Sequence, residues 1–467
     1  MEWSKLLSTK RVRDLFEGPP TTKAGGELRT EFERDHGRAL FSTPVRRLQD
    51  KAQVFPLDPH DAVRTRLTHS FEVSNVARDL ARSAAQWMLK EKHITDPQEA
   101  YSIETIAATC GLIHDLGNPP FGHSGEEAIS GWFKRKSDND ESFLDFAGAK
   151  EDQYSQDFLR FEGNAQTIRL VSKLQVLSDL HGLNFTCGTL SAACKYTAAS
   201  HQTTQKGDKI HETTKPGYFA SENELVAKLR AETGTQEKRN PITFLVEACD
   251  DIVYATVDLE DGHKKGVLSW DTFSEEIKKD CGAGILDMIM KLVEKTVGRG
   301  AKLLDTPGRH EANMQAFRTF AIGVLVPSVL EAFKKNYPQI ITGDYHGELV
   351  TDCDASSLIN SCKRIGREIV YCSKETLRLE VMGRGVIQDL MDFFWEAASQ
   401  ADGSSTPSGF AGKIYALISR NYRQVFTNSC QNKLNPLKYS QMQLMTDHIC
   451  GMTDGYACSL HRQLKNG

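Results

Sequence analysis

The sequence predicts a mainly α-helical protein in which at most one short β-hairpin interrupts the helices. Apolar residues recur every three or four positions along most of the chain, which is the repeat of a helix with one buried face. Strand-like patterning is confined to QIITGDYHGELV, residues 339–350, where a turn-rich centre separates two β-branched runs. The 467 residues, 39% of them hydrophobic, can bury a sizeable core.

The first predicted helix covers residues 63–89, with apolar residues at helical spacing: Leu67, Phe71, Val76, Leu80 and Trp87. Residues 102–116 repeat the pattern, with Ser102 as the expected N-cap and Gly117 as the expected stop. His114 and Asp115 should therefore end a buried helix. Further helices are predicted at 165–180, 222–232, 241–261, 273–296, 311–335, 374–399, 409–426 and 438–465.

Polar stretches without periodicity indicate loops or inserts at 17–38, 134–162, 200–221 and 400–409. The net charge of −5 leaves no global basic footprint for nucleic acid or membrane binding, so an anionic substrate would need local positive charge. No signal-like or bilayer-length uncharged segment is present, which favours a cytoplasmic protein with no membrane partner. The 11 cysteines form no CxxC pair, which disfavours a zinc site or a disulfide framework.

One constellation of histidines and aspartates stands out. His69, the adjacent His114 and Asp115, and the pair Asp250 and Asp251 come from three predicted helices with buried faces. Imidazoles and carboxylates from buried helices make a site for a divalent transition metal or magnesium, and burying the acids without a cation would be costly. The alternative is that the two aspartates pair with an arginine or cap a neighbouring turn.

The stretch HDLGNPPFGHSGEE, residues 114–127, contains a second group. Ser124 to Glu127 fit the capping box S-x-x-E, which predicts that a new helix starts at Ser124. His123 would then precede the cap and Glu126 would lie in the first turn, so both could point into one pocket. A histidine held by a glutamate beside a metal can transfer protons, because the carboxylate fixes the tautomer of the ring. Alternatively, Glu126 only complements the helix dipole.

The order H…HD…D of these residues resembles the metal signature of the HD-domain phosphohydrolase superfamily. The sequence motifs around it narrow the resemblance to the dGTPase family of bacterial dNTP triphosphohydrolases. The resemblance extends from about residue 30 to the C-terminus. The motifs are FSTPVRRLQDKAQVFP, RTRLTHSFEV, GLIHDLGNPPFGHSGEEAI, RFEGNAQTIRL, KPGYFASE, EACDDIVYATVDLEDG and GMTDGYA. Asn118 stands where the vertebrate branch of these enzymes has a histidine, so at this position the chain resembles the bacterial branch.

The resemblance implies a divalent metal, Mg²⁺ or Mn²⁺, held by His69, His114, Asp115 and Asp250. Asp251 is the alternative to Asp250 as the fourth ligand. The resemblance also implies that His123 and Glu126 are catalytic, with His123 protonating the leaving 5′ oxygen or, alternatively, acting as a nucleophile. It implies sugar recognition by Gln53, Tyr254 and Asp258, the tyrosine ring excluding a 2′ hydroxyl. The other implied substrate-binding residues are Arg66, Asn164, Lys195, Tyr196, Lys215 and Tyr218.

The implied reaction is hydrolysis of a dNTP, with dGTP preferred, to a deoxynucleoside and tripolyphosphate. The implied organisation is an N-terminal segment 1–59 that contributes to the active site, an HD-domain core 60–335 and a C-terminal helical region 336–467 that forms a homo-oligomer, commonly a hexamer. Alternatives are a broad-specificity dNTP triphosphohydrolase, an HD phosphodiesterase or nucleotidase acting on another phosphate ester, and a non-catalytic protein that binds nucleotides or single-stranded nucleic acid. Nucleic acid remains a possible further partner.

Overall fold

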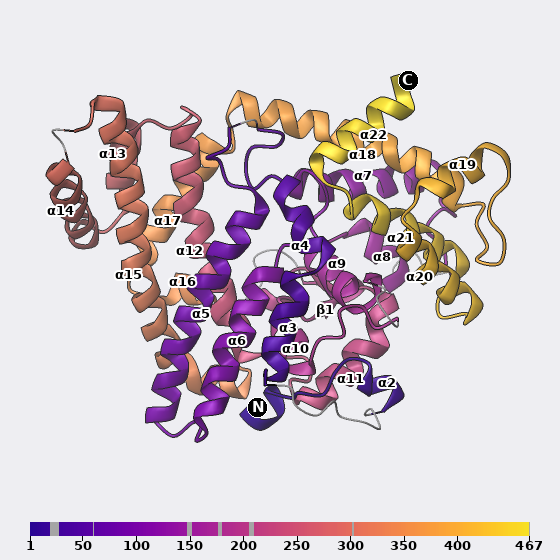
Figure 1. Ribbon diagram of the computed structural model, residues 1–467, viewed down its shortest axis with the longest axis horizontal. Helices are drawn as coiled ribbons and strands as arrows, with labels where there is room; N and C mark the ends of the chain where they lie inside the picture. The colour runs from indigo at the N-terminus through magenta and orange to yellow at the C-terminus, as the bar shows by residue number, and fades with distance from the viewer. Residues whose placement is uncertain are drawn as a thin grey trace. The chain divides into compact units, whose positions relative to one another are not determined.

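The structure is a computed structural model that describes residues 1–18, 28–58, 60–146, 152–175, 180–204, 210–300 and 303–466. The chain divides into two compact units, each built from separate stretches of sequence. Unit 1 contains residues 1–52, 112–240 and 380–467, and unit 2 contains residues 53–111 and 241–379. Helices dominate both units, which confirms the mainly α-helical class (Figure 1).

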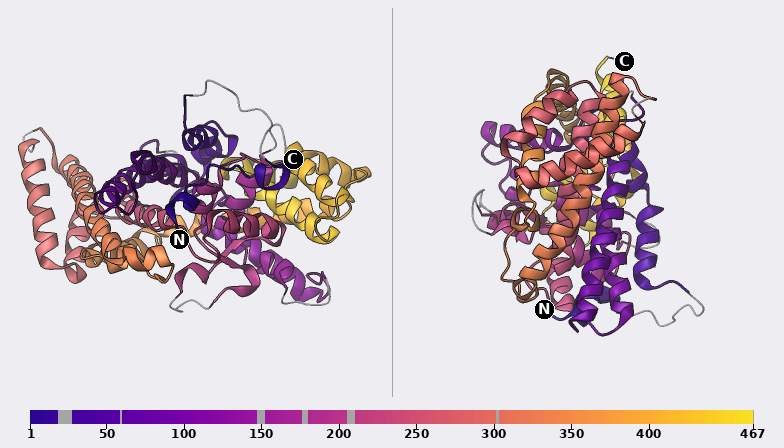
Figure 2. Two further views of the ribbon diagram at one scale, coloured as in Figure 1. Left: turned by 90° about the horizontal axis from the view of Figure 1, so that it is seen from below. Right: turned by 90° about the vertical axis from the view of Figure 1, so that its left-hand side faces the viewer.

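Unit 2 is a stack of long helices around α12 (Pro241–Lys264), which packs against both α5 (Arg66–Lys90) and α15 (Thr306–Thr342). Figures 1 and 2 show these helices running beside one another. Val73 of α5 and Val253 and Val257 of α12 form a fully buried cluster in this interface. The remaining elements are α6 (Pro97–Ile113), α13 (Trp270–Asp280), α14 (Ala283–Gly300), α16 (Leu349–Asp352), α17 (Ser356–Ile365), the π-helix η6 (Gly366–Val370) and the start of α18 (Lys374–Ala398).

Helix α6 lies unusually close to α5 because Gly111 has no side chain. A Cβ atom at this position would lie 2.8 Å from the Cα atom of Ser74. The hydroxyl of Ser74 donates to the carbonyl of Ala108 at 2.7 Å, so a hydrogen bond reinforces the contact. The end of α6 is thereby fixed against α5, and the chain continues directly into His114.

Unit 1 is built from shorter helices and turns. Its N-terminal stretch carries α1 (Trp3–Leu6), α2 (Asp14–Glu17), α3 (Glu31–Leu40), α4 (Thr43–Arg47) and the 3₁₀ turn η1 (Leu48–Asp50). Its middle stretch carries α7 (Gly122–Asn139), α8 (Gln153–Leu159), α9 (Gly163–Arg169), the π-helix η2 (Leu170–Leu174), α10 (Cys187–Ala193), the 3₁₀ turns η3 (Ser200–Gln202), η4 (His211–Thr213) and η5 (Ala220–Glu222), and α11 (Asn223–Thr233). The C-terminal stretch carries most of α18, then α19 (Gly409–Leu417), α20 (Arg420–Gln431), α21 (Leu437–Cys450) and α22 (Asp454–Asn466).

A two-stranded parallel sheet in unit 1 joins β1 (Ala198–Ala199) to β2 (Pro216–Tyr218). Gly217 permits the pairing, because a Cβ atom there would lie 2.0 Å from the carbonyl oxygen of Tyr196. The sheet therefore brings Lys195 and Tyr196 beside Lys215, although about twenty residues separate them in the sequence. This pairing was not predicted from the sequence, since two- and three-residue strands show no periodicity.

The hairpin predicted at 339–350 is wrong. Ile340, Ile341 and Thr342 are the last residues of α15, and Ile340 is completely buried. Gly343, with a φ of 79°, ends that helix in the left-handed conformation typical of a helix C-terminus, and α16 follows. The β-branched residues therefore stay helical because packing of a long helix overrides their local preference.

Several predicted boundaries are also corrected. The expected helices 273–296, 409–426 and 438–465 are each two helices, with breaks at Cys281–Gly282, Ile418–Ser419 and Gly451–Thr453. The expected loops at 17–38 and 134–162 contain α3, the end of α7, and α8. Ser102 lies inside α6, where its hydroxyl donates to the carbonyl of Gln98, and α6 ends at Ile113 rather than Gly117. The helix expected at 165–180 is seen to residue 174, and residues 176–179 lie outside the described part of the chain.

Helix α15 is the one helix among the described residues that is long and apolar enough to cross a membrane by length and composition. Length and composition alone do not indicate a membrane span, because a helix in a protein core passes the same test. Helix α15 packs against α12 in unit 2. All 11 cysteines are free thiols, seven of them buried. This agrees with a sequence that offers neither a CxxC zinc motif nor a disulfide framework.

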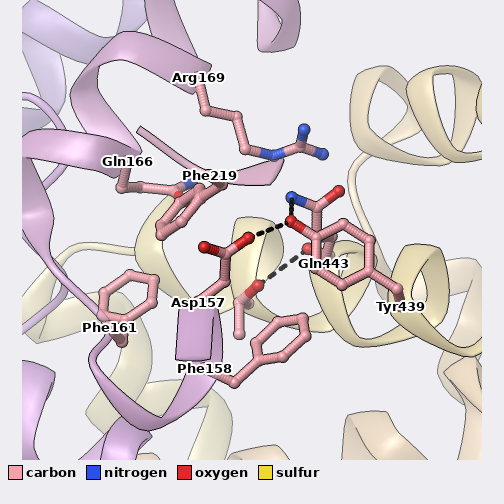
Figure 3. Close-up of a pocket in the computed structure, with 9 residues that line it drawn as sticks. Asp157, Phe158, Phe161, Gln166, Arg169, Phe219, Tyr439 and Gln443 are labelled. Atoms are coloured by element: carbon pink, nitrogen blue, oxygen red, sulfur yellow. Dashed lines mark hydrogen bonds between the residues drawn. The ribbon is translucent and has the colours of Figure 1, made fainter. Parts of the chain in front are cut away.

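A buried polar cluster ties the helices of unit 1 together (Figure 3). The guanidinium of Arg169 bonds to Asp447 at 2.7 Å and to Glu222 at 3.1 Å. The carboxyl oxygens of Asp157 accept from the hydroxyls of Ser200 and Tyr439, each at 2.6 Å, and from the amide of Ala220 at 2.7 Å. The lining side chains leave no space for a water molecule, so this cluster is structural.

Asp157 should make the stability of the protein depend on pH. Its burial raises the pKa to about 8, against the opposing effect of its hydrogen bonds. The folded protein therefore keeps a proton that the unfolded chain releases above about pH 4. The free energy of unfolding should fall as pH rises from about 4 to 8, by at most about 1.4 kcal/mol per pH unit from this group.

The measurement is chemical unfolding of the wild type and of Asp157→Asn between pH 5 and 8. The variant has no titrating group at this position, so its free energy of unfolding should fall less steeply with pH than that of the wild type. Equal slopes for the two proteins would contradict a protonated Asp157.

Candidate metal centre

The two helices that carry His69 and Asp250 are fixed in unit 2. Thr65 caps α5 with its side chain, which accepts the amide of Thr68, so that His69 lies one turn into the helix. The ring of His69 is completely buried, and its Nε2 atom lies 3.1 Å from Oδ1 of Asp250 on α12. The packing of α5 on α12 described above therefore places an imidazole and a carboxylate from residues 181 positions apart in direct contact.

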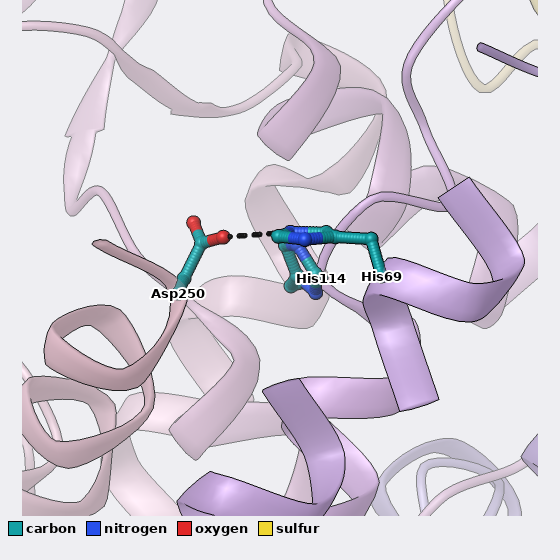
Figure 4. Close-up of side chains that lie close together, drawn as sticks. All are labelled: His69, His114 and Asp250. Carbon is teal, nitrogen blue, oxygen red and sulfur yellow. Dashed lines mark hydrogen bonds and ion pairs between the residues drawn. The ribbon is translucent and has the colours of Figure 1, made fainter. Parts of the chain in front are cut away.

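His114 directly follows α6 and completes a group of three (Figure 4). Each of His69, His114 and Asp250 offers one ligand atom, and these atoms all lie within 4.8 Å of one another. An ion about 2.1 Å from each ligand spaces its ligand atoms by roughly 3 to 4 Å, so the three are gathered close to what one ion requires. Two imidazole nitrogens and a carboxylate oxygen suit a divalent transition metal.

The two adjacent aspartates of α12 have different surroundings. Asp250 contacts His69, whereas Oδ1 of Asp251 forms an ion pair with Nζ of Lys363 on α17 at 3.0 Å. The sequence left open that the aspartates only pair with a basic side chain. Asp251 does form such a pair, although its partner is a lysine and not the expected arginine. This geometry favours Asp250 as the metal ligand.

The fourth expected ligand, Asp115, lies outside the group of three. Its Oδ1 atom accepts from the side-chain Nδ2 of Asn118 at 2.6 Å, and its Oδ2 atom lies 3.6 Å from Nε2 of His114. Asn118, the residue that departs from the vertebrate sequences, thus orients the carboxylate of Asp115. The role of Asp115 as a ligand stays a prediction.

His123 and Glu126 form the expected pair, but the helix that carries them starts earlier than predicted. Helix α7 begins at Gly122 with Phe121 as its N-cap, so Ser124 lies in the first turn and is not the cap. The reason is the conformation of Phe121 and Gly122, whose φ angles of 63° and 56° already turn the chain into the helix. Nδ1 of His123 lies 2.8 Å from Oε2 of Glu126, as residues three apart on a helix allow.

Glu126 also connects α7 to α9. Its Oε1 atom accepts the amide of Gly163, the first residue of α9, at 2.7 Å, and the carboxylate is nearly buried. Glu126 is thus fixed by two partners, whereas the side chain of His123 is 83% exposed. The reading of Glu126 as a mere complement to the helix dipole does not account for its contact with His123.

The predicted sugar-recognition residues lie in unit 2 and include two buried oxygen atoms with no partner. Oε1 of Gln53 and Oδ1 of Asp258 are both buried without a hydrogen-bond partner among the described residues. Oδ2 of Asp258 accepts from the hydroxyl of Tyr371 at 2.7 Å, and the ring of Tyr371 stacks on that of Tyr254 with centroids 5.7 Å apart. Burial raises the pKa of Asp258 well above its usual value.

Tyr371 was missed by the sequence reasoning. It lies 113 positions from Asp258, directly after the π-helix η6, and belongs to none of the predicted helices. No periodicity or spacing pointed to it, because its contacts with Tyr254 and Asp258 form only in the folded chain. Such buried, incompletely satisfied oxygens are usually explained by a ligand or an ordered water.

Four of the other predicted substrate-binding residues, Asn164, Lys195, Tyr196 and Lys215, gather at the small sheet of unit 1. Nζ of Lys215 forms an ion pair with Glu162 at 2.9 Å, and the Nζ atoms of Lys195 and Lys215 each lie 5.9 Å from the ring centre of Tyr196. Asn164 donates to Glu162 at 2.7 Å, which joins it to the same group. Burial lowers the pKa of Lys215, but Glu162, Tyr196 and Glu126 together more than offset this, so the pKa is raised overall.

The other two predicted residues have different surroundings. Tyr218 ends β2, and its ring lies 5.3 Å below the guanidinium of Arg230. Arg66 is the first residue of α5 in unit 2 and is only 8% exposed, one turn before His69. A buried cation at this position is more than a solvated surface charge.

Comparisons with known proteins agree with the family resemblance that the sequence motifs indicated. The HD domain family model matches residues 66–167, which include His69, His114, Asp115, His123 and Glu126. A deoxyguanosinetriphosphate triphosphohydrolase-like protein of Listeria innocua is 36% identical, with 99% of each chain covered. A deoxyguanosinetriphosphate triphosphohydrolase of Yersinia pseudotuberculosis is 31% identical, with 96% of each chain covered.

Proposed function

The chain belongs to the deoxyguanosinetriphosphate triphosphohydrolase family of HD-domain proteins, and on that premise we propose that it hydrolyses dGTP at the α-phosphorus to deoxyguanosine and tripolyphosphate. The observation that carries this proposal is the group His69, His114 and Asp250, with a His123–Glu126 pair on the helix that follows His114. A dNTP triphosphohydrolase needs both parts, a metal centre and a proton donor.

The metal would be held by His69, His114, Asp115 and Asp250, and Mg²⁺ or Mn²⁺ is the proposed ion. When bound, such an ion would polarise phosphoryl oxygens and lower the pKa of a water molecule that it binds toward neutral pH. Asp250 rather than Asp251 is the proposed ligand, because Lys363 already neutralises Asp251. The donor set suits a manganese ion at least as well as magnesium, since two of its members are imidazoles.

The side chains of the protein supply the proton and the positive charge. In the imidazolium form of His123, Nδ1–H donates a hydrogen bond to Glu126, which stabilises the charged ring, and Nε2–H can donate its proton to the leaving 5′ oxygen of the nucleoside. Lys195 and Lys215, gathered around Tyr196, and Arg66 are proposed to stabilise the charge of the triphosphate. Asn164 and Tyr218 are proposed to support this binding.

The sugar would be recognised in unit 2. The unpartnered oxygens of Gln53 and Asp258 can accept hydrogen bonds from sugar hydroxyls, because an acceptor buried without a partner gains most from a ligand donor. Tyr254, stacked on Tyr371, presents a fixed ring that would exclude a 2′ hydroxyl. Preference for a deoxynucleotide therefore rests on shape rather than on a specific hydrogen bond.

The organisation of the chain is proposed to follow the family. Residues 1–59 would contribute Gln53 to the active site, residues 60–335 would form the catalytic core, and residues 336–467 would form a homo-oligomer, commonly a hexamer, in the cytoplasm. Exposed apolar residues on α18 support an interface there: Leu377 is 45%, Val381 74% and Met382 37% exposed.

The deciding experiment mixes the purified protein with Mn²⁺ or Mg²⁺ and each dNTP or GTP, and separates the products by anion exchange. We expect tripolyphosphate and a deoxynucleoside in equal amounts, fastest from dGTP and undetectable from GTP. Equal rates with all four dNTPs would replace the dGTP preference by broad specificity. Pyrophosphate, orthophosphate or no turnover would overturn the proposed function.

A further inference from the structure

The turn Asn118 to Gly122 connects the candidate ligands His114 and Asp115 to the first turn of α7. Phe121 adopts a left-handed backbone conformation with a φ of 63°, which is unfavourable for a residue with a bulky side chain. Such a conformation persists only where the surroundings enforce it. Three contacts, all within unit 1, enforce it here.

The first contact comes from Asp454, the first residue of α22 and part of the sequence motif GMTDGYA. Its carboxylate accepts two backbone amides, that of Phe121 on Oδ1 and that of Ala52 on Oδ2, each at 2.9 Å. Asp454 is 1% exposed, and hydrogen bonds to a buried carboxylate are stronger than those between neutral groups. One side chain thus holds the turn and also the residue that precedes Gln53.

The second contact comes from Lys51, which donates hydrogen bonds to backbone carbonyls, whereas Asp454 accepts them from backbone amides. Lys51 is 3% exposed, and its Nζ atom donates to the carbonyl of Asn118 at 2.6 Å and to that of Cys450 at 2.8 Å. Lys51 and Asp454 therefore connect the same three stretches of chain, one through carbonyls and the other through amides. A buried lysine and a buried aspartate each cost free energy unless they are bonded, and here both are bonded to backbone groups of the neighbouring stretches.

The third contact comes from α18. Gly383 lies against the ring of Phe121, and a Cβ atom at this position would lie 2.5 Å from Cγ of Phe121. The ring therefore packs directly on the bare backbone of the helix. Gly385, two residues further along the same helix, has open space around it.

We propose that Asp454 and Gly383 are positioning residues for catalysis, through which the C-terminal helices α18 and α22 set the location of His123. The inference rests on the proposed function, because it concerns the proton transfer assigned to His123. The ring of His123 is 83% exposed, so packing restrains it little and its location follows the backbone of Gly122. A displacement of about 1 Å at a catalytic group can cost a hundredfold in rate.

The first test compares Gly383→Ala with Gly385→Ala. Both exchange glycine for alanine inside α18, but only the first pushes against Phe121. We expect Gly383→Ala to lower kcat for dGTP at least tenfold, with KM and Mn²⁺ affinity within twofold of the wild type. Gly385→Ala should stay within twofold in all three. A parallel loss of kcat, Mn²⁺ affinity and thermal stability in Gly383→Ala would indicate a purely structural role and overturn the inference.

The second test compares Asp454→Asn with Thr453→Ala. The hydroxyl of Thr453 accepts the amide of Tyr456 at 3.2 Å and donates to the carboxylate of Asp50, so its loss weakens the same helix end and its contact with η1 but leaves both bonds of Asp454. Asp454→Asn should lower kcat at least tenfold and speed amide hydrogen exchange at Phe121, whereas Thr453→Ala should do neither. If Asp454→Asn does not fold, the Gly383→Ala result decides.

Wild-type kinetics separate the two proposals. If the wild type releases tripolyphosphate but both Gly383→Ala and Asp454→Asn retain kcat within twofold, the inference alone fails. If the wild type releases none, the proposed function fails. Unchanged amide exchange at Phe121 in Asp454→Asn would then overturn the inference as well, since the turn would not depend on Asp454.

Discussion

His123→Ala is expected to lower kcat for dGTP hydrolysis by about 10²- to 10⁴-fold, the usual contribution of a positioned proton donor. The affinity for Mn²⁺ should not change, because His123 is not in the group formed by His69, His114 and Asp250. The ring is largely exposed, so thermal stability should also stay close to that of the wild type. The measurements are steady-state kinetics, Mn²⁺ titration followed by electron paramagnetic resonance, and thermal unfolding.

The pair should behave as one unit. Glu126→Gln removes the charge that faces Nδ1 of His123 but keeps the size of the side chain. The double variant should then be hardly slower than His123→Ala, since groups that act together give non-additive losses. Multiplied losses in the double variant, or turnover in His123→Ala close to the wild type, would show that the pair does not transfer the proton.

Asp250→Ala should abolish activity at micromolar Mn²⁺ by removing a metal ligand. Loss of a partner that only orients a ligand weakens metal binding by about 10- to 100-fold, and loss of a ligand should exceed that. Asp251→Ala is the matched control on the same helix. It breaks a partly exposed ion pair with Lys363, worth at most about 1 kcal/mol, and should leave Mn²⁺ affinity unchanged.

Calorimetric Mn²⁺ titration of the two variants distinguishes the adjacent aspartates. If Asp251→Ala instead loses the metal while Asp250→Ala binds it, the assignment of the ligand is wrong. If both variants bind Mn²⁺ like the wild type, α12 contributes no ligand.

Helical periodicity was sufficient to predict the elements that carry the metal centre. The predicted apolar stripe of α5 is only partly on the buried face, since Leu80 is buried but Phe71 is 46% exposed. The face that packs on Val253 of α12 instead carries His69 and Val73. Spacing alone left open whether the aspartates of α12 pair with a base, and the resemblance to the HD-domain superfamily singled out His69 and Asp250. Their contact follows from the way that the two helices pack.

Other features could not be predicted because they depend on contacts between distant residues. Phe121 takes up its left-handed conformation under the influence of Asp454, 333 positions away, so the capping box at Ser124 was a local signal without the tertiary partner that overrides it. The contact of Tyr371 with Asp258 is equally remote. The end of α15 was mistaken for a hairpin because three β-branched residues favour strands locally but pack in a helix.

The pairing of β1 with β2 has a consequence for how this enzyme family can change. The sheet fixes both ends of the segment that separates Lys195 and Tyr196 from Lys215 through backbone hydrogen bonds, which the missing side chain of Gly217 permits. Doubling the length of a closed loop costs only about 0.6 kcal/mol. Insertions between the two strands that leave Ser200 and its bond to Asp157 in place should therefore be tolerated without displacing the lysines, so the length of this segment can change while the two lysines stay together.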